Sequence, residues 1–205
     1  MDATKINQTL NIYNDLKKKI LNGQLKTGDR LNESGYAKGY KASRLHVKDA
    51  FRLLENEKLA QYLEMKGFAV IGVSEETLEE VAIIRQALEE IIVKKVIQVA
   101  TDEDIKAMKH IVKRMYIFLE NEMYRDNIEE YKKFYEYMYQ LCNYPRIIGI
   151  LNTYDDYINL LITKSTSKTE KFVLGYKIIE RLIDAIENRD EKTAIKEIRL
   201  ILELV

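Results

Sequence analysis

After residue 72 the sequence contains almost nothing that would interrupt a helix. Six of its eight glycines lie between Gly23 and Gly72, and only Gly149 and Gly175 follow. The single proline, Pro145, is compatible with the first turn of a helix. Because glycine and proline are the strongest breakers of regular structure, the last two thirds of the chain are predicted to form long helices with short connections. The first third is predicted to contain short elements and turns.

The first third has the pattern of three helices followed by two strands. Apolar spacing and turn residues predict helices at 4–22, at 34–40 and from about 43 onward, and two strands within 59–73. Gly23 ends the first helix, because glycine adopts the left-handed conformation at little cost. Ser43 is a good N-cap for the third. The two strands are expected to turn at Lys66 and Gly67, and this order of elements is that of a winged helix-turn-helix.

The remainder of the chain is predicted to be helical throughout. Its apolar spacing predicts helices near 75–100, 102–124, 127–141, 145–164, 169–187 and 190–204. Ser74 is expected to cap the first of these helices, and the pairs Thr101–Asp104 and Asp126–Glu129 resemble capping boxes. Six helices with short connections predict an antiparallel bundle.

The predicted fold is therefore mainly α, with a winged helix-turn-helix domain over 1–73 and a helical effector-binding and dimerisation domain over 74–205. The charge supports this division. The whole chain has 33 basic and 33 acidic residues, but residues 1–74 hold 13 of the basic and only 8 of the acidic ones. A uniformly basic nucleic-acid binder is excluded, whereas a first domain that meets a polyanion is favoured.

Other functional classes have little support in the sequence. The one cysteine, Cys142, allows no intrachain disulfide, and neither a secretory signal nor a membrane helix is recognisable, so a cytoplasmic protein without a membrane partner is expected. Two histidines, His46 and His110, cannot form a site that needs three imidazoles. No nucleophile elbow, phosphate-binding loop, zinc-protease motif or C-x-x-C occurs, and an enzyme is not expected.

The most informative segment is ESGYAKGYKASRLHVKDAFRLLENEKL, residues 33–59. Ala37 and Lys41 have the spacing of the helix crossing and the tight turn in a helix-turn-helix. The second helix of such a motif enters the major groove with its N-terminal residues facing the base edges. The expected DNA contacts are Ser34, Ser43, Arg44, Leu45, His46, Lys48 and Arg52. For His46 and Lys48, a plain solvated face is the alternative.

These residues resemble the GntR family of transcription regulators, whose pattern is roughly E-x-x-L-A-x-x-x-G-V-S-R-T-P-V-R-E-A-L-x-x-L-E-x-E-G-L. The segment KGFAV resembles the family's wing, and the resemblance implies further DNA contacts at Lys66 and Gly67. The segment IRQALEE, residues 84–90, is similar to the start of the FCD effector domain of the FadR subfamily.

Three departures from the family pattern have physical consequences. Lys41 replaces the turn glycine, so a residue with a Cβ is expected at positive φ. Leu45 and His46 replace Thr-Pro. Lys48 replaces an arginine and is a point charge rather than a bidentate fork. A DNA sequence preference different from that of typical members is expected.

Many FCD domains bind a divalent metal through one Asp and three His ligands, and the resemblance places Tyr131, Tyr135, Ile179 and Ile201 at those positions. With only His110 in this region, a three-His site is impossible. The sequence therefore predicts no metal and no cofactor. The remaining possibilities are a metal-independent effector and a domain whose sensing has decayed.

A ligand pocket is predicted around Tyr131, Tyr135 and Tyr139, which recur at four-residue steps on one helical stripe. Arg85 is a candidate partner for a carboxylate or phosphate, which suggests an organic acid or an acyl compound as effector. Two alternatives stand beside this interpretation. The tyrosines could belong to the core or to a subunit interface, and Arg85 could pair with Glu89, its i+4 neighbour.

Taken together, the sequence predicts a regulator that binds double-stranded operator DNA as a homodimer under the control of a small molecule. The palindrome is implied because two recognition helices read two half-sites. A winged-helix protein-interaction module, or a regulator that has lost ligand sensing, is the alternative.

Overall fold

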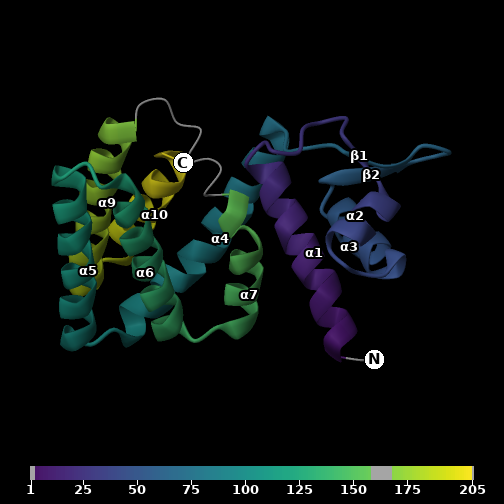
Figure 1. Cartoon of the computed structure of the whole chain (residues 1–205). Helices are drawn as coiled ribbons and strands as arrows, with labels where there is room; N and C mark the ends of the chain where they lie inside the picture. Colours follow the sequence, from purple (N-terminus) through teal and green to yellow (C-terminus); the bar gives the residue numbers. More distant parts are fainter. Residues whose placement is uncertain (1–2, 158–167, 205) are drawn as a thin grey trace. The chain divides into compact units, whose positions relative to one another are not determined.

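The computed structural model describes residues 3–157 and 168–204 of the chain (Figure 1). The chain divides into two compact units, Met1–Leu78 and Glu79–Val205. The structure is mainly helical, as predicted, with one small sheet in the first unit.

The first unit is a winged helix-turn-helix. Its elements are α1 (Ala3–Leu21), β1 (Arg30–Leu31), α2 (Glu33–Gly39), α3 (Arg44–Asn56), β2 (Ala60–Leu63) and β3 (Gly67–Val70). The helix α1 packs against α3, and α2 packs against the same helix. The core forms where apolar residues recur on one face of α3, and Phe51, fully buried, has ring contacts with Tyr36 and Phe68.

The sheet has one strand more than the sequence predicted. Its order is β1-β3-β2, and both pairings are antiparallel. In the added strand, Arg30 pairs with Ala69 and Leu31 pairs with Phe68. A two-residue strand is too short to show a period-2 alternation, so only its partner on β3 identifies it.

The second unit is a bundle of helices. After α4 (Glu75–Val99), it contains α5 (Asp102–Glu120), α6 (Tyr124–Cys142), α7 (Pro145–Thr153), α9 (Lys168–Glu187) and α10 (Glu191–Leu204). The helix α5 packs against α6 and α9, and α9 packs against α10 (Figure 1). Met108, Phe134, Ile179, Leu182 and Ile198 are among the fully buried residues at the centre.

The structure confirms several predicted helix boundaries. Thr101 and Asp104 form a capping box at the start of α5, and Ser74 Oγ accepts a hydrogen bond from the Thr77 N–H at 3.2 Å. Pro145 occupies the first turn of α7. Gly23, with φ +75°, follows the end of α1.

The predicted capping box at Asp126–Glu129 is wrong. The helix α5 ends at Glu120 because Glu122 takes a left-handed conformation, with φ 57°. The next helix starts at Tyr124, which places Asp126 inside its first turn. The buried side chain of Asn127 donates to the Met115 carbonyl at 2.7 Å and ties this turn to α5.

The single helix predicted over 145–164 starts at Pro145, as predicted, but ends earlier than predicted. The helix α7 ends at Thr153, with Tyr154 as its C-cap. Residues 158–164 lie outside the described residues.

Candidate nucleic-acid interface and ligand pocket

The helix α3 has one apolar face and one basic face. Val47, Ala50, Phe51 and Leu54 are all completely buried. Arg44, Lys48 and Arg52 follow one another at four-residue steps and therefore share a stripe along the helix. Arg44 and Arg52 are exposed, and Lys48 is half-buried. The result is a helix anchored on one side with cations available on another.

The other predicted DNA contacts, on α3 and just before it, differ in exposure and in hydrogen bonding. Leu45 is 63% exposed, an unusual position for an apolar side chain. Ser43 is the N-cap of α3, and its Oγ accepts from the His46 N–H at 3.2 Å. Its hydroxyl hydrogen remains able to donate to a phosphate. His46 is half-buried, and its Nδ1 has no hydrogen-bond partner among the described residues.

Ser34 is exposed at the start of α2, where its backbone N–H donates to Asn32 Oδ1 at 3.0 Å. Asn32 is the N-cap of this helix and also accepts from Gly35. The exposed hydroxyl of Ser34 is therefore a candidate hydrogen-bond donor to a phosphate.

The turn between α2 and α3 has the strained residue that was predicted. Lys41 has φ 50°. The Ala42 N–H donates to the Ala37 carbonyl at 3.0 Å, which closes the turn around it. The prediction of positive φ at Lys41 is confirmed.

Replacing Lys41 by glycine should stabilise the first unit. The expected gain in the free energy of unfolding is roughly 0.5–1 kcal/mol, the difference between left-handed strain and the extra freedom of glycine in the unfolded chain. Urea unfolding followed by circular dichroism measures it. Lys38→Gly, within α2, is the matched control and should lose about 1 kcal/mol. A loss of stability in Lys41→Gly would show that the Lys41 side chain contributes more than its strain costs.

The wing is a tight hairpin of β2 and β3. Its turn, residues 64–66, brings Met65 to φ 59° and Gly67 to φ +76°. Lys66 is exposed, as a phosphate contact requires, and Gly67 is half-buried at the start of β3. Met65 is 98% exposed at the tip, and the sequence analysis missed it. A methionine between two strand patterns, where turn residues are usually polar, was the available signal.

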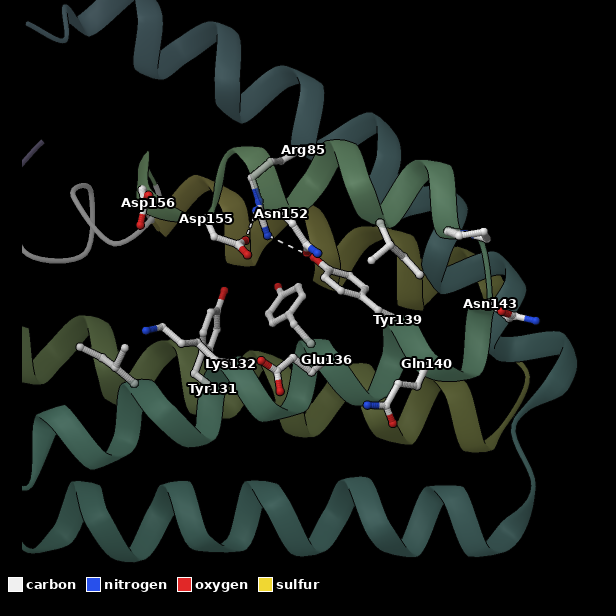
Figure 2. A pocket seen from close by; sticks show the side chains of 14 residues that line it. Arg85, Tyr131, Lys132, Glu136, Tyr139, Gln140, Asn143, Asn152, Asp155 and Asp156 are labelled. Atoms are coloured by element: carbon white, nitrogen blue, oxygen red, sulfur yellow. Dashed lines mark hydrogen bonds and ion pairs between the residues drawn. The ribbon is translucent and has the colours of Figure 1, made fainter. Parts of the chain in front are cut away.

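In the helical unit, a cavity of about 720 Å³ lies beside α6 (Figure 2). Figure 2 shows Arg85 and Asp155 on one side of the cavity and Tyr131 and Glu136 of α6 on the other. The complete lining consists of Arg85, Ile128, Tyr131, Lys132, Tyr135, Glu136, Tyr139, Gln140, Asn143, Pro145, Ile148, Asn152, Asp155 and Asp156. The structure therefore brings together all four predicted ligand-binding residues in one cavity.

Arg85 is the most highly connected side chain of this cavity. It is 5% exposed and bonds Glu89 at 2.6 Å, Asp155 at 3.0 Å and the hydroxyl of Tyr139 at 3.2 Å. Burial opposes the charge of Arg85, but the negative charge of Glu89 favours it, and the pKa of Arg85 is raised above its ordinary value. The pairing with Glu89, which the sequence left as an alternative, is present.

Glu89 is 1% exposed, so its charge depends on Arg85. Burial raises the pKa of Glu89 above its ordinary value, while Arg85 acts in the opposite direction. Breaking such a pair on one side leaves the other charge without compensation.

The three tyrosines line the cavity and also belong to the packing of α6. The ring centroids of Tyr131 and Tyr135 are 4.9 Å apart, and those of Tyr135 and Tyr139 are 6.0 Å apart. Burial, followed by the charge of Glu89, raises the pKa of all three hydroxyls. They therefore stay protonated and can donate hydrogen bonds.

Two family models match the chain. The model described as "Bacterial regulatory proteins, gntR family" matches residues 8–70, and the FCD domain model matches residues 80–204. This chain belongs to the GntR family. It is a GntR-type transcriptional regulator with an FCD effector-binding domain.

Individual relatives agree with the GntR assignment. The chain is 36% identical over 100 residues to the "Uncharacterized HTH-type transcriptional regulator YdhC" of Bacillus subtilis, a match that spans 49% of this chain and 45% of that relative. It is 22% identical to the "Gluconate operon transcriptional repressor" of Bacillus subtilis over 95% of this chain and 82% of the relative. The solved structure "E. coli McbR/YncC" shares the fold, with a TM-score of 0.69, 20% identity and coverage of 99% and 95% of the two chains.

Four side chains stand at the positions that the resemblance to FCD domains assigns to metal ligands, and they do not form a typical site for a divalent metal. Ile179 and Ile201 are buried in the apolar core. Tyr131 and Tyr135 lie on the cavity wall. Within residues 3–157 and 168–204, no three His, Cys, Asp or Glu side chains are placed to hold a metal ion.

Several cavity residues were not predicted. Asn152, Asp155 and Asp156 follow α6 by ten or more residues and reach the cavity only through the turn at Pro145. No local pattern marks them, because polar residues at a helix end are ordinary.

In the described part of the chain, no helix combines the length and apolar character that crossing a membrane requires.

Proposed function

We propose that this GntR regulator binds a palindromic operator as a homodimer, and that a small molecule in the cavity of the FCD domain controls this binding. The observation that carries the DNA-binding part is the basic stripe of α3 beside its buried face. Arg44 and Arg52 are exposed there in line with Lys48, while Val47 and Phe51 fix the helix from behind.

The candidate contacts on α2, on α3 and its N-cap, and on the wing have separate roles in the proposal. Arg44, at the first turn of α3, is placed to read a guanine through its bidentate guanidinium. Arg52 and Lys66 bind phosphates, which positions the protein without reading sequence. Ser34 and Ser43 add neutral hydrogen bonds to the backbone.

The homodimer follows from how such a motif reads DNA. One recognition helix covers one half-site, and half-sites about one helical turn apart require a second copy of the chain. The likeness to the gluconate operon repressor favours repression of an operon as the form of regulation. The cavity, with its buried polar groups, supports control by a small molecule.

Salt dependence tests whether the protein binds DNA through phosphates. Affinity for a duplex should fall steeply between about 50 and about 200 mM salt, with a slope of roughly −0.9 per phosphate neutralised. Fluorescence anisotropy with labelled duplexes measures this slope. Absence of binding at both salt concentrations would favour a protein-interaction module instead.

The proposal also requires no metal. Elemental analysis of the purified protein should find no stoichiometric divalent ion, and EDTA should leave the melting temperature unchanged, because a chelator destabilises a protein only when the bound ion contributes to folding. One tightly bound ion per subunit, lost in EDTA together with thermal stability, would overturn this prediction.

A further inference from the structure

We infer that the cavity of the FCD domain binds an organic cation, a ligand with an ammonium-type group on an apolar body. This inference rests on the proposed function, in which the cavity is the effector site. The expectation of an organic acid depended on a free Arg85, and the contacts of Arg85 remove that basis.

Arg85 has no charge left to offer an anion. Its Nη2 bonds Glu89 at 2.6 Å and its Nη1 bonds Asp155 at 3.0 Å, so two carboxylates already balance one guanidinium. Its Nε is buried without a partner among the described residues. That single N–H suits a neutral acceptor such as a hydroxyl or carbonyl oxygen of the ligand.

Apart from Arg85 and Lys132, the charged side chains that line the cavity are carboxylates. Lys132, the second cation of the lining, bonds Glu129 at 3.2 Å. Glu136 and Asp156 also line the cavity, and neither forms an ion pair with another described residue. Three carboxylates and two cations line the cavity, and both cations are already paired. A negatively charged ligand would therefore meet repulsion, and a positive one attraction.

The Tyr135 hydroxyl gives the wall of the cavity a buried polar atom. Tyr135, only 4% exposed, lines the cavity, and its hydroxyl forms no hydrogen bond of normal geometry with the described residues. It interacts with Glu89, which lies outside the lining, and with Tyr131. Buried polar atoms normally find a hydrogen-bond partner. A ligand with an N–H donor offers one to the hydroxyl oxygen of Tyr135.

The tyrosine rings favour a cation with an apolar body. The faces of tyrosine rings attract cations within about 6 Å of the ring centroid. Tyr131, Tyr135 and Tyr139 place three adjacent rings on one wall, and about 720 Å³ is within the size range of small-molecule sites.

Three size-matched probes separate charge from shape. We would titrate the full-length protein with benzylammonium, benzyl alcohol and benzoate at constant ionic strength, and follow binding by NMR and by the melting temperature. The expected order of affinity is benzylammonium first, benzyl alcohol second and benzoate last. Equal affinities, tighter binding of benzoate, or no binding of any probe would overturn the inference. DNA binding is measured separately, so failure of the regulator proposal is distinguishable from failure of this one.

Variants locate the binding in this cavity. Glu136→Gln should weaken benzylammonium about 2- to 5-fold, as for a solvent-exposed charge pair. Tyr135→Phe should weaken it about 2- to 10-fold, as for a single hydrogen bond. Glu103→Gln, an exposed carboxylate of α5 outside the lining, is the control and should leave the affinity unchanged. Equal effects of Glu136→Gln and Glu103→Gln would place the cation elsewhere and contradict the inference.

Discussion

The Arg44→Ala variant is expected to lose most of its preference for operator over random DNA. A bidentate arginine–guanine contact discriminates by roughly 1–3 kcal/mol for each recognition helix, and a dimer loses two such contacts. The fold should survive, since Arg44 is exposed and the core residues of α3 are untouched. Anisotropy titrations with operator and scrambled duplexes measure both affinities.

Two comparisons make the Arg44 result specific. Lys18→Ala removes the same charge from the exposed surface of α1 and should leave discrimination intact. Arg52→Ala should weaken operator and scrambled duplexes alike, because a phosphate contact carries no sequence information. Retained discrimination in Arg44→Ala would mean that other residues of α3 read the bases.

The Arg85→Met variant is expected to be the least stable of the single substitutions discussed. Glu89 would lose its buried partner, and breaking a buried ion pair from one side costs about 3–5 kcal/mol. Asp155, which is half exposed, would be rehydrated at little cost. Urea unfolding of wild type and variant at neutral pH measures the loss.

The loss should depend on pH with a definite sign. Burial raises the pKa of Glu89, and without Arg85 only hydrogen bonds from Tyr135 and Tyr139 oppose that effect. The folded variant then holds a proton that the unfolded chain releases above its ordinary pKa of about 4.3. The folded state therefore binds more protons, and its stability falls as the pH rises above that value. At lower pH the difference from wild type should shrink.

The double variant Arg85→Met with Glu89→Gln is the matched control. It leaves no ionisable group at position 89, so most of the stability and the pH independence should return. Replacing both partners of a buried pair is often nearly neutral. A pH-independent loss in the single variant, unchanged in the double one, would show that Arg85 acts through packing alone.

The sequence predicted the fold well because its signals are local. Gly23, Ser43, Ser74 and the Thr101–Asp104 pair each act within one helical turn, and the structure has them in those roles. The predicted start of α6 failed because Glu122 and Met123, ordinary residues in sequence, turn the chain three residues early. The strand β1 was missed because it exists only through pairing with β3.

The cavity was predicted in part, for a similar reason. The stripe of Tyr131, Tyr135 and Tyr139 and the i+4 neighbour of Arg85 are spacings on single helices. The contact of Arg85 with Asp155 joins residues 70 positions apart, and no pattern encodes it. That contact changes the chemistry of the site, because it removes the free cation on which an organic acid would depend.

Binding-site selection from a random duplex library tests the central claim, sequence-specific recognition of DNA by a dimer, most directly. Performed at low and at moderate salt, it should enrich a palindrome whose half-sites lie about one helical turn apart, roughly 10 base pairs. Retention of duplexes without any enriched sequence, or no retention at either salt, would contradict the account.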